Sequence, residues 1–124
     1  MSMTCHSDAA CVVYGQVPSK SNCYKVITLH GHGSLAKTVA LRKYEDAFYM
    51  QCSLRGKGID KRFRLVIDVY YSSDRPDLDN ALKIVLDCLQ ACNAIKNDRL
   101  CSAIDARKLI DKEKPRIEFV LQVE

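Results

Sequence analysis

The chain has 124 residues, of which 48% are hydrophobic and 27% are charged. This length suits one domain with a modest core, and the apolar content is too high for a disordered protein. The 19 Lys and Arg against 15 Asp and Glu give a formal charge of +4. This mild basic excess fits an anionic partner, but many proteins without one share it.

The cysteines and the first residues bear on the compartment of the protein. Seven cysteines are many, but the number is odd, and the start MSMTCHSDAA lacks the basic residues and long apolar run of a signal peptide. We therefore expect reduced thiols in a cytoplasmic protein. No apolar run approaches the ~20 residues that cross a bilayer, so no membrane segment is expected.

The predicted domain covers residues 10–124, after a flexible tail over residues 1–9. In its first part, apolar and β-branched runs bounded by turn residues indicate three strands, over residues 11–17, 24–29 and 34–39. The last two strands flank the sequence HGHG (30–33). Gly31 and Gly33 can adopt the positive φ of a tight turn, so the two strands are expected to form a hairpin.

The second part of the domain is predicted to contain two helices and three strands. Apolar residues at helical spacing indicate a helix over residues 40–54, and alternation indicates a half-buried strand over residues 62–71. The second helix begins near Asp77 and carries an apolar stripe of Leu78, Leu82, Val85, Leu89 and Cys92, widened by Ala81 and Leu86. Closing strands are expected over residues 101–110 and 116–123.

The order β-β-β-α-β-α-β-β describes a single α+β domain, a mixed β-sheet with two main helices. Basic segments flank the start of the second helix. Residues 55–75 hold six bases and three acids, and residues 96–116 hold seven bases and four acids. Such surface fits a polyanion bound around a central cation, and it equally fits an ordinary solvated face.

Acidic residues gather around the second helix. Asp77 and Asp79 lie at its start, where backbone N–H groups favour negative charge, so capping alone explains one of them. Two carboxylates this close repel each other unless a cation lies between them. Mg²⁺ prefers carboxylate oxygens completed by water and phosphate oxygens, and Asp98, after a short loop, could add a third carboxylate. The alternatives are helix capping for the pair and a turn role for Asp98.

Lys83 lies one helical turn after Asp79 on the same face. A lysine in this place can neutralise the charge that develops on a phosphate, or can orient an attacking water. The alternative is a solvated side chain that forms an ion pair with Asp79 or Asp87.

Cysteine and histidine residues suggest a further hypothesis, a zinc-binding interaction module built from Cys88, Cys92, Cys101, His30 and His32. The sequence has no Cys-x₂-Cys knuckle, and Cys92 lies on the apolar stripe of the second helix. Core packing by small thiols is the favoured interpretation.

The sequence DLDNALKIVLD over residues 77–87 resembles the central motif of the RusA family of Holliday-junction resolvases, small dimeric endodeoxyribonucleases. The resemblance extends to the turn in residues 17–22 and to the order of the elements. It implies that Asp77, Asp79 and Asp98 bind the metal and are catalytic, and that Lys83 is the catalytic lysine. Asn97 stands where many members have the first acid of an Asp-Asp pair, so the ligand is assigned to Asp98.

The resemblance also implies an activity. Mg²⁺ or Mn²⁺ would activate water to cut a four-way DNA junction, leaving 5′-phosphate and 3′-hydroxyl ends. A homodimer would supply the two symmetric sites that paired nicks require. The expected DNA-binding residues are Arg75, Asn80, Lys96, Arg99 and Lys108. The alternative is a non-cleaving protein of the same fold that binds branched nucleic acid, although pure binding gains little from carboxylates near phosphates.

Overall fold

The computed structural model describes residues 8–124. Within these residues the chain forms, in order, β1 (Asp8–Tyr14), the 3₁₀ turn η2 (Lys20–Asn22), β2 (Tyr24–Leu29), β3 (His32–Lys37), α1 (Val39–Gln51), β4 (Phe63–Tyr71), α2 (Leu78–Ala91), the 3₁₀ turn η3 (Asp98–Leu100), β5 (Cys101–Ile110) and β6 (Arg116–Val123). The predicted α+β fold and the order of its elements are confirmed.

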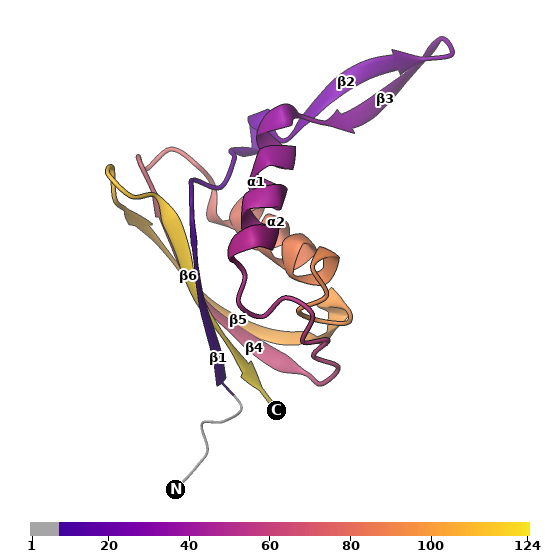
Figure 1. Cartoon of the computed structure of the whole chain (residues 1–124). Helices are drawn as coiled ribbons and strands as arrows, with labels where there is room; N and C mark the ends of the chain where they lie inside the picture. Colours follow the sequence, from indigo (N-terminus) through magenta and orange to yellow (C-terminus); the bar gives the residue numbers. More distant parts are fainter. Residues whose placement is uncertain (1–7) are drawn as a thin grey trace, which may run out of the picture.

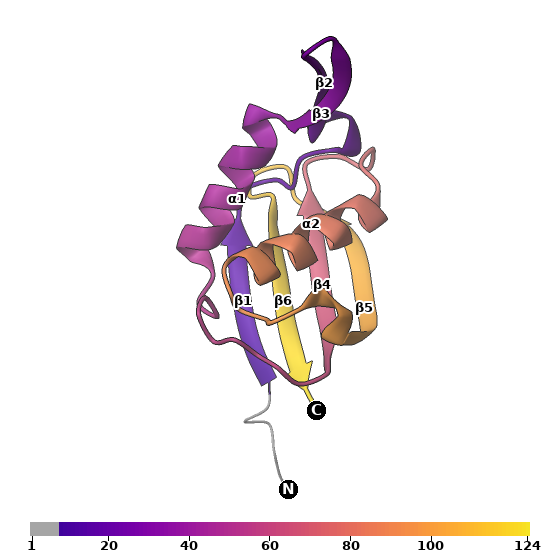
Figure 2. The same ribbon diagram turned by 90° about the vertical axis from the view of Figure 1, so that its right-hand side faces the viewer.

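The main sheet has four strands in the order β1-β6-β4-β5. β6 runs antiparallel to both β1 and β4, whereas β5 runs parallel to β4. A parallel pair needs a crossover connection, and α2 provides it. Both helices cover the same face of the sheet, so the domain has two layers, and no helix of residues 8–124 covers the other face (Figures 1 and 2).

The core lies between the sheet and the two helices. Alternate residues of β4, from Phe63 to Tyr71, are buried against the helices. From α1, Phe48 is fully buried and stacks on Phe119 of β6, with ring centroids 6.1 Å apart. Aromatic pairs of this kind add to the free energy gained from burying their area, so this contact fixes α1 against the sheet.

The buried face of α2 differs slightly from the predicted stripe. The side chains that reach the core are Ala81, Ile84, Val85, Cys88 and Leu89, while Leu78, Leu82 and Leu86 are only partly buried and pack at the margin. The small Ala81 and Cys88 let the helix approach the sheet closely, which turns the larger leucines toward the rim. Of the predicted stripe, Ala81, Val85, Leu89 and Cys92 are confirmed as buried.

Several predicted bounds agree with the structure and others shift. The strands over residues 24–29, 101–110 and 116–123 are confirmed to the residue. β1 begins three residues before the prediction, at Asp8, and residues 1–7 of the predicted tail lie outside the described residues. No helix in residues 8–124 is long and apolar enough to span a membrane.

The β2–β3 hairpin projects away from both layers (Figure 1). Its turn consists of His30 and Gly31, both with positive φ (52° and 81°), as a tight two-residue hairpin requires. Gly33 instead lies within β3, opposite Thr28. At the base, the Thr38 amide donates to the Cys23 carbonyl at 3.0 Å, and the Thr38 hydroxyl accepts the Leu41 amide at the start of α1.

Candidate functional site

Asp77 and Asp79 lie at the start of α2, beyond the carboxyl end of β4. Asp77 is the N-cap residue of the helix, yet its side chain makes no capping hydrogen bond. Both residues are exposed, and no lysine or arginine of residues 8–124 forms an ion pair with either carboxylate. Helix capping therefore does not occupy these oxygens, and two uncommitted anionic side chains stand one residue apart.

Tyr71, the last residue of β4, lies beneath the acidic pair. It is fully buried, and its hydroxyl donates to the Asp77 carbonyl at 3.4 Å. Burial raises the pKa of Tyr71 to about 12, and the negative charges of Asp77 and Asp79 add to the shift. The hydroxyl thus stays protonated at neutral pH and supports the backbone from which Asp77 projects. The sequence indicated only a core tyrosine here.

Lys108 of β5 holds the loop that carries the acidic pair. Its ammonium donates to the carbonyls of Asp74 at 3.0 Å and Pro76 at 3.2 Å, and it lies 3.2 Å from the Asp74 carboxylate. An ammonium has three donors, and these three contacts use them. In this structure Lys108 therefore holds the loop in place, and its expected contact with DNA stays a prediction.

Asn80 has a comparable role. Its side-chain amide donates to the Pro18 carbonyl at 3.0 Å, which ties the first turn of α2 to the segment before the hairpin. Five residues were expected to contact DNA. The side chains of Asn80 and Lys108 form hydrogen bonds within the chain, whereas those of Arg75, Lys96 and Arg99 are exposed.

Lys83 is exposed on α2 and forms an ion pair with Asp87 at 3.3 Å. Asp87 lies one helical turn after Lys83. This ion pair is the alternative to a catalytic role that the sequence analysis described. Such exposed pairs contribute less than about 1 kcal/mol to stability, so the ammonium can leave Asp87 at little cost. The ion pair describes the position of the Lys83 side chain without DNA, and a catalytic role for Lys83 stays a prediction.

Asp98 lies near the end of the sheet where β4 and β5 begin, whereas the acidic pair lies beyond the end where β4 stops. β5 pairs with β4 from Phe63↔Cys101 to Tyr71↔Ile110, a length of about 25 Å at the usual rise of a strand. Asp98 precedes the start of this pairing, and Asp77 follows its end. Because β5 is parallel to β4, the chain after α2 must return to the edge where β4 began (Figure 2).

One subunit therefore does not bring the three predicted acids together. Within residues 8–124, no group of three or more His, Cys, Asp and Glu side chains is placed to hold a metal ion. The same finding removes the zinc module for the described residues: Cys88 and Cys92 are buried in the core, while His30 and His32 lie at the tip of the hairpin.

The surroundings of Asp98 present its carboxylate outward. Its backbone amide donates to the Gln90 side chain at 2.8 Å, and the Asn97 side chain accepts the Arg99 amide at 3.0 Å. Asn97 thus caps the short turn from which the exposed Asp98 projects. Lys96 and Arg99 flank it in the sequence as exposed basic residues.

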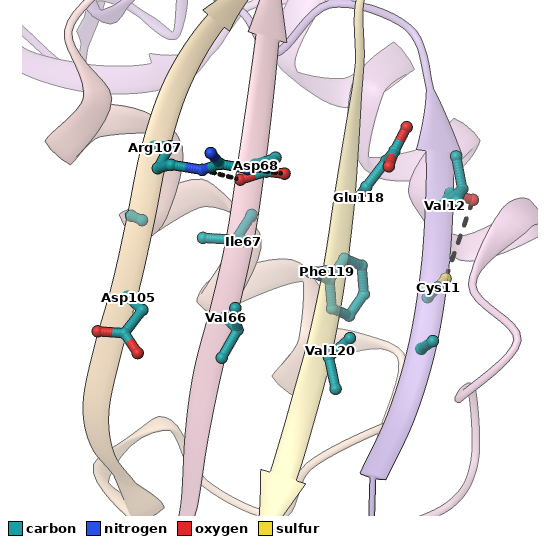
Figure 3. Close-up of a pocket in the computed structure, with 12 residues that line it drawn as sticks. Cys11, Val12, Val66, Ile67, Asp68, Asp105, Arg107, Glu118, Phe119 and Val120 are labelled. Atoms are coloured by element: carbon teal, nitrogen blue, oxygen red, sulfur yellow. Dashed lines mark hydrogen bonds and ion pairs between the residues drawn. The ribbon is translucent and has the colours of Figure 1, made fainter.

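A cavity of about 680 Å³ lies on the sheet face away from the helices and includes none of these residues. Two of its acids are already paired. Asp68 accepts two hydrogen bonds of 2.9 Å from Arg107 (Figure 3), and Asp105 accepts one of 2.8 Å from Arg64. Carboxylates neutralised in this way are poor metal ligands. Between these two places, the carboxylates without an ion-pair partner in residues 8–124 therefore lie in the acidic pair and not in this cavity.

Comparisons with known proteins agree with the motif around the acidic pair. The sequence model of the family described as Endodeoxyribonuclease RusA matches residues 32–122. This span contains β3 to β5 and most of β6. A search of the curated proteins finds no match to the chain.

Proposed function

The chain belongs to the RusA family of endodeoxyribonucleases, the Holliday-junction resolvases, and from this premise we propose how its own residues cut the junction. Asp77 and Asp79 of one subunit, together with Asp98 of the partner subunit, would hold the catalytic metal. The observation that carries the proposal is the pair of exposed, uncommitted carboxylates at the start of α2.

The donor set fits a hard divalent cation. Carboxylates are acceptor-only ligands, and Mg²⁺ usually takes one or two of them and completes its shell with water and substrate phosphates. Bound there, Mg²⁺ or Mn²⁺ would supply positive charge to the scissile phosphate and lower the pKa of the attacking water. Tyr71 and Lys108 hold the backbone of the site, so Asp77 and Asp79 keep their positions without a ligand.

Lys83 supplies positive charge that the acidic pair lacks. It lies one turn along α2 from Asp79 and is held only by the exposed Asp87. A phosphate that enters the site offers the ammonium a stronger partner than Asp87. The lysine then stabilises the charge that develops on the phosphate during cleavage.

A homodimer explains the position of Asp98. Since a single chain keeps Asp98 at the other edge of the sheet, the third carboxylate has to come from a second copy. A two-fold dimer then forms two equal sites, and a four-way junction offers two equivalent strands to them. Paired nicks follow from this symmetry. The ends would be 5′-phosphate and 3′-hydroxyl if water attacks the phosphorus and the 3′ oxygen leaves.

The proposal is tested by incubating the protein with a synthetic four-way junction or a linear duplex, in Mg²⁺, in Mn²⁺ or in EDTA. We expect symmetric nicks in the junction, none in EDTA, and little cutting of the duplex. Tight junction binding without cutting under both metals would favour the alternative, a non-cleaving junction-binding protein.

Replacing Lys83 by Ala is expected to slow single-turnover junction cleavage by about 10²-fold, because the transition state loses an electrostatic partner. The free energy of unfolding should change by less than about 1 kcal/mol, since only an exposed pair is lost. Asp87→Asn is the matched control, because it breaks the same ion pair but keeps the lysine. Equal cleavage rates in the two variants would remove Lys83 from the catalytic set.

A further inference from the structure

The distribution of charge along the chain is uneven around the hairpin. Between Asp8 and Glu45 the sequence has no acidic residue. The same stretch holds five bases, Lys20, Lys25, Lys37, Arg42 and Lys43. This segment includes the hairpin and the first turn of α1, so the arm that projects from the domain carries positive charge alone.

A groove runs where one face of the hairpin meets the start of α1. It has a volume of about 280 Å³ and is lined by Lys25, Ile27, Ala36, Lys37, Val39 and Arg42. Lys37 is neutralised by Glu45 at 2.7 Å. Lys25 and Arg42 are exposed, and no acid of residues 8–124 forms an ion pair with either. These two side chains therefore give the groove its charge.

The arm begins next to the candidate site. Asn80, the residue after Asp79, is hydrogen-bonded to the Pro18 carbonyl, and η2 and β2 follow directly. Each strand of the hairpin has six residues, so the arm reaches about 20 Å from its base. A DNA strand held at the acidic pair can thus continue along the arm without leaving basic surface.

We propose that the groove between β2–β3 and α1 binds the phosphate backbone of a junction arm through Lys25 and Arg42. The inference rests on the proposed function and adds to it a second contact region outside the cutting site. Phosphate contacts from lysine and arginine position DNA without reading its sequence. Ile27 and Val39 also line the groove and offer apolar contact to the deoxyribose sugars.

The test is the double variant Lys25→Gln/Arg42→Gln, assayed for junction binding in EDTA by fluorescence anisotropy over a range of salt concentrations. We expect about tenfold weaker binding near 0.1 M salt, and a slope of log K against log salt that is smaller by about two. The charge-matched control is Lys112→Gln/Lys114→Gln in the β5–β6 turn, which does not line the groove and is separated from the hairpin by the helices in Figure 1. The control should bind like the wild type.

Three results would overturn the inference. The groove variant could bind the junction as tightly as the wild type does. The control variant could weaken binding as much as the groove variant, and the effect would then come from net charge alone. Light scattering could instead show that the groove variant loses its oligomeric state, which would assign the groove to a second copy. Failure of the proposed function is distinguishable, because the wild-type protein would then not cut the junction at all in Mg²⁺.

Discussion

Asn in place of Asp77 or Asp79 is expected to lower the rate of junction cleavage by about 10³-fold, while junction binding stays near the wild-type value or tightens. Each change removes an anionic ligand of a hard cation, so the metal is held more weakly. The same change reduces repulsion of the phosphates, so affinity should not fall. Single-turnover cleavage and anisotropy, both as functions of Mg²⁺ concentration, measure the two effects separately.

The matched control for these variants is Asp60→Asn. Asp60 is also exposed, and within residues 8–124 it forms no ion pair. The control should cut at the wild-type rate, which shows that the loss is specific to the start of α2. Wild-type cutting by Asp77→Asn or by Asp79→Asn would contradict the assignment of that residue as a ligand.

Asp98→Asn is expected to cause a loss of similar size, about 10³-fold, although Asp98 lies at the far edge of its own subunit. The reason is that its carboxylate completes the site of the partner subunit. Asp105→Asn is the control, because Asp105 is an exposed acid on the following strand that pairs with Arg64 instead. If Asp98→Asn cut junctions normally, two carboxylates would suffice and the partner would supply no ligand.

The sequence predicted most of the fold because its strands carry clear alternation. β4 buries every second residue from Phe63 to Tyr71, and period-2 patterns of this kind also fixed β6. The hairpin turn could be placed only approximately, since HGHG offers two glycines and only Gly31 takes positive φ. The buried face of α2 was predicted only in part, since Ile84 and Cys88 also reach the core. Side-chain size, which decides how closely a helix packs, is not part of the periodicity.

The sequence proposed the residues of the candidate site but not how they are placed relative to one another. The motif identified Asp77, Asp79, Lys83 and Asp98, but periodicity does not say that β5 runs parallel to β4, and that direction separates Asp98 from the pair. The contacts of Lys108 with the β4–α2 loop likewise depend on which strands are neighbours. The expected DNA contact of this lysine came from the resemblance to the RusA family, and it stays a prediction.

The claim that two subunits share each site is tested most directly by mixing two inactive variants, Asp79→Asn and Asp98→Asn, under conditions that exchange subunits. A mixed dimer contains one site with both changes and one site with Asp79 from one subunit and Asp98 from the other, both intact. We predict that mixing restores nicking of one junction strand in the mixed dimers, although each variant alone is inactive. A mixture that exchanges subunits and stays as inactive as its components would contradict the shared site.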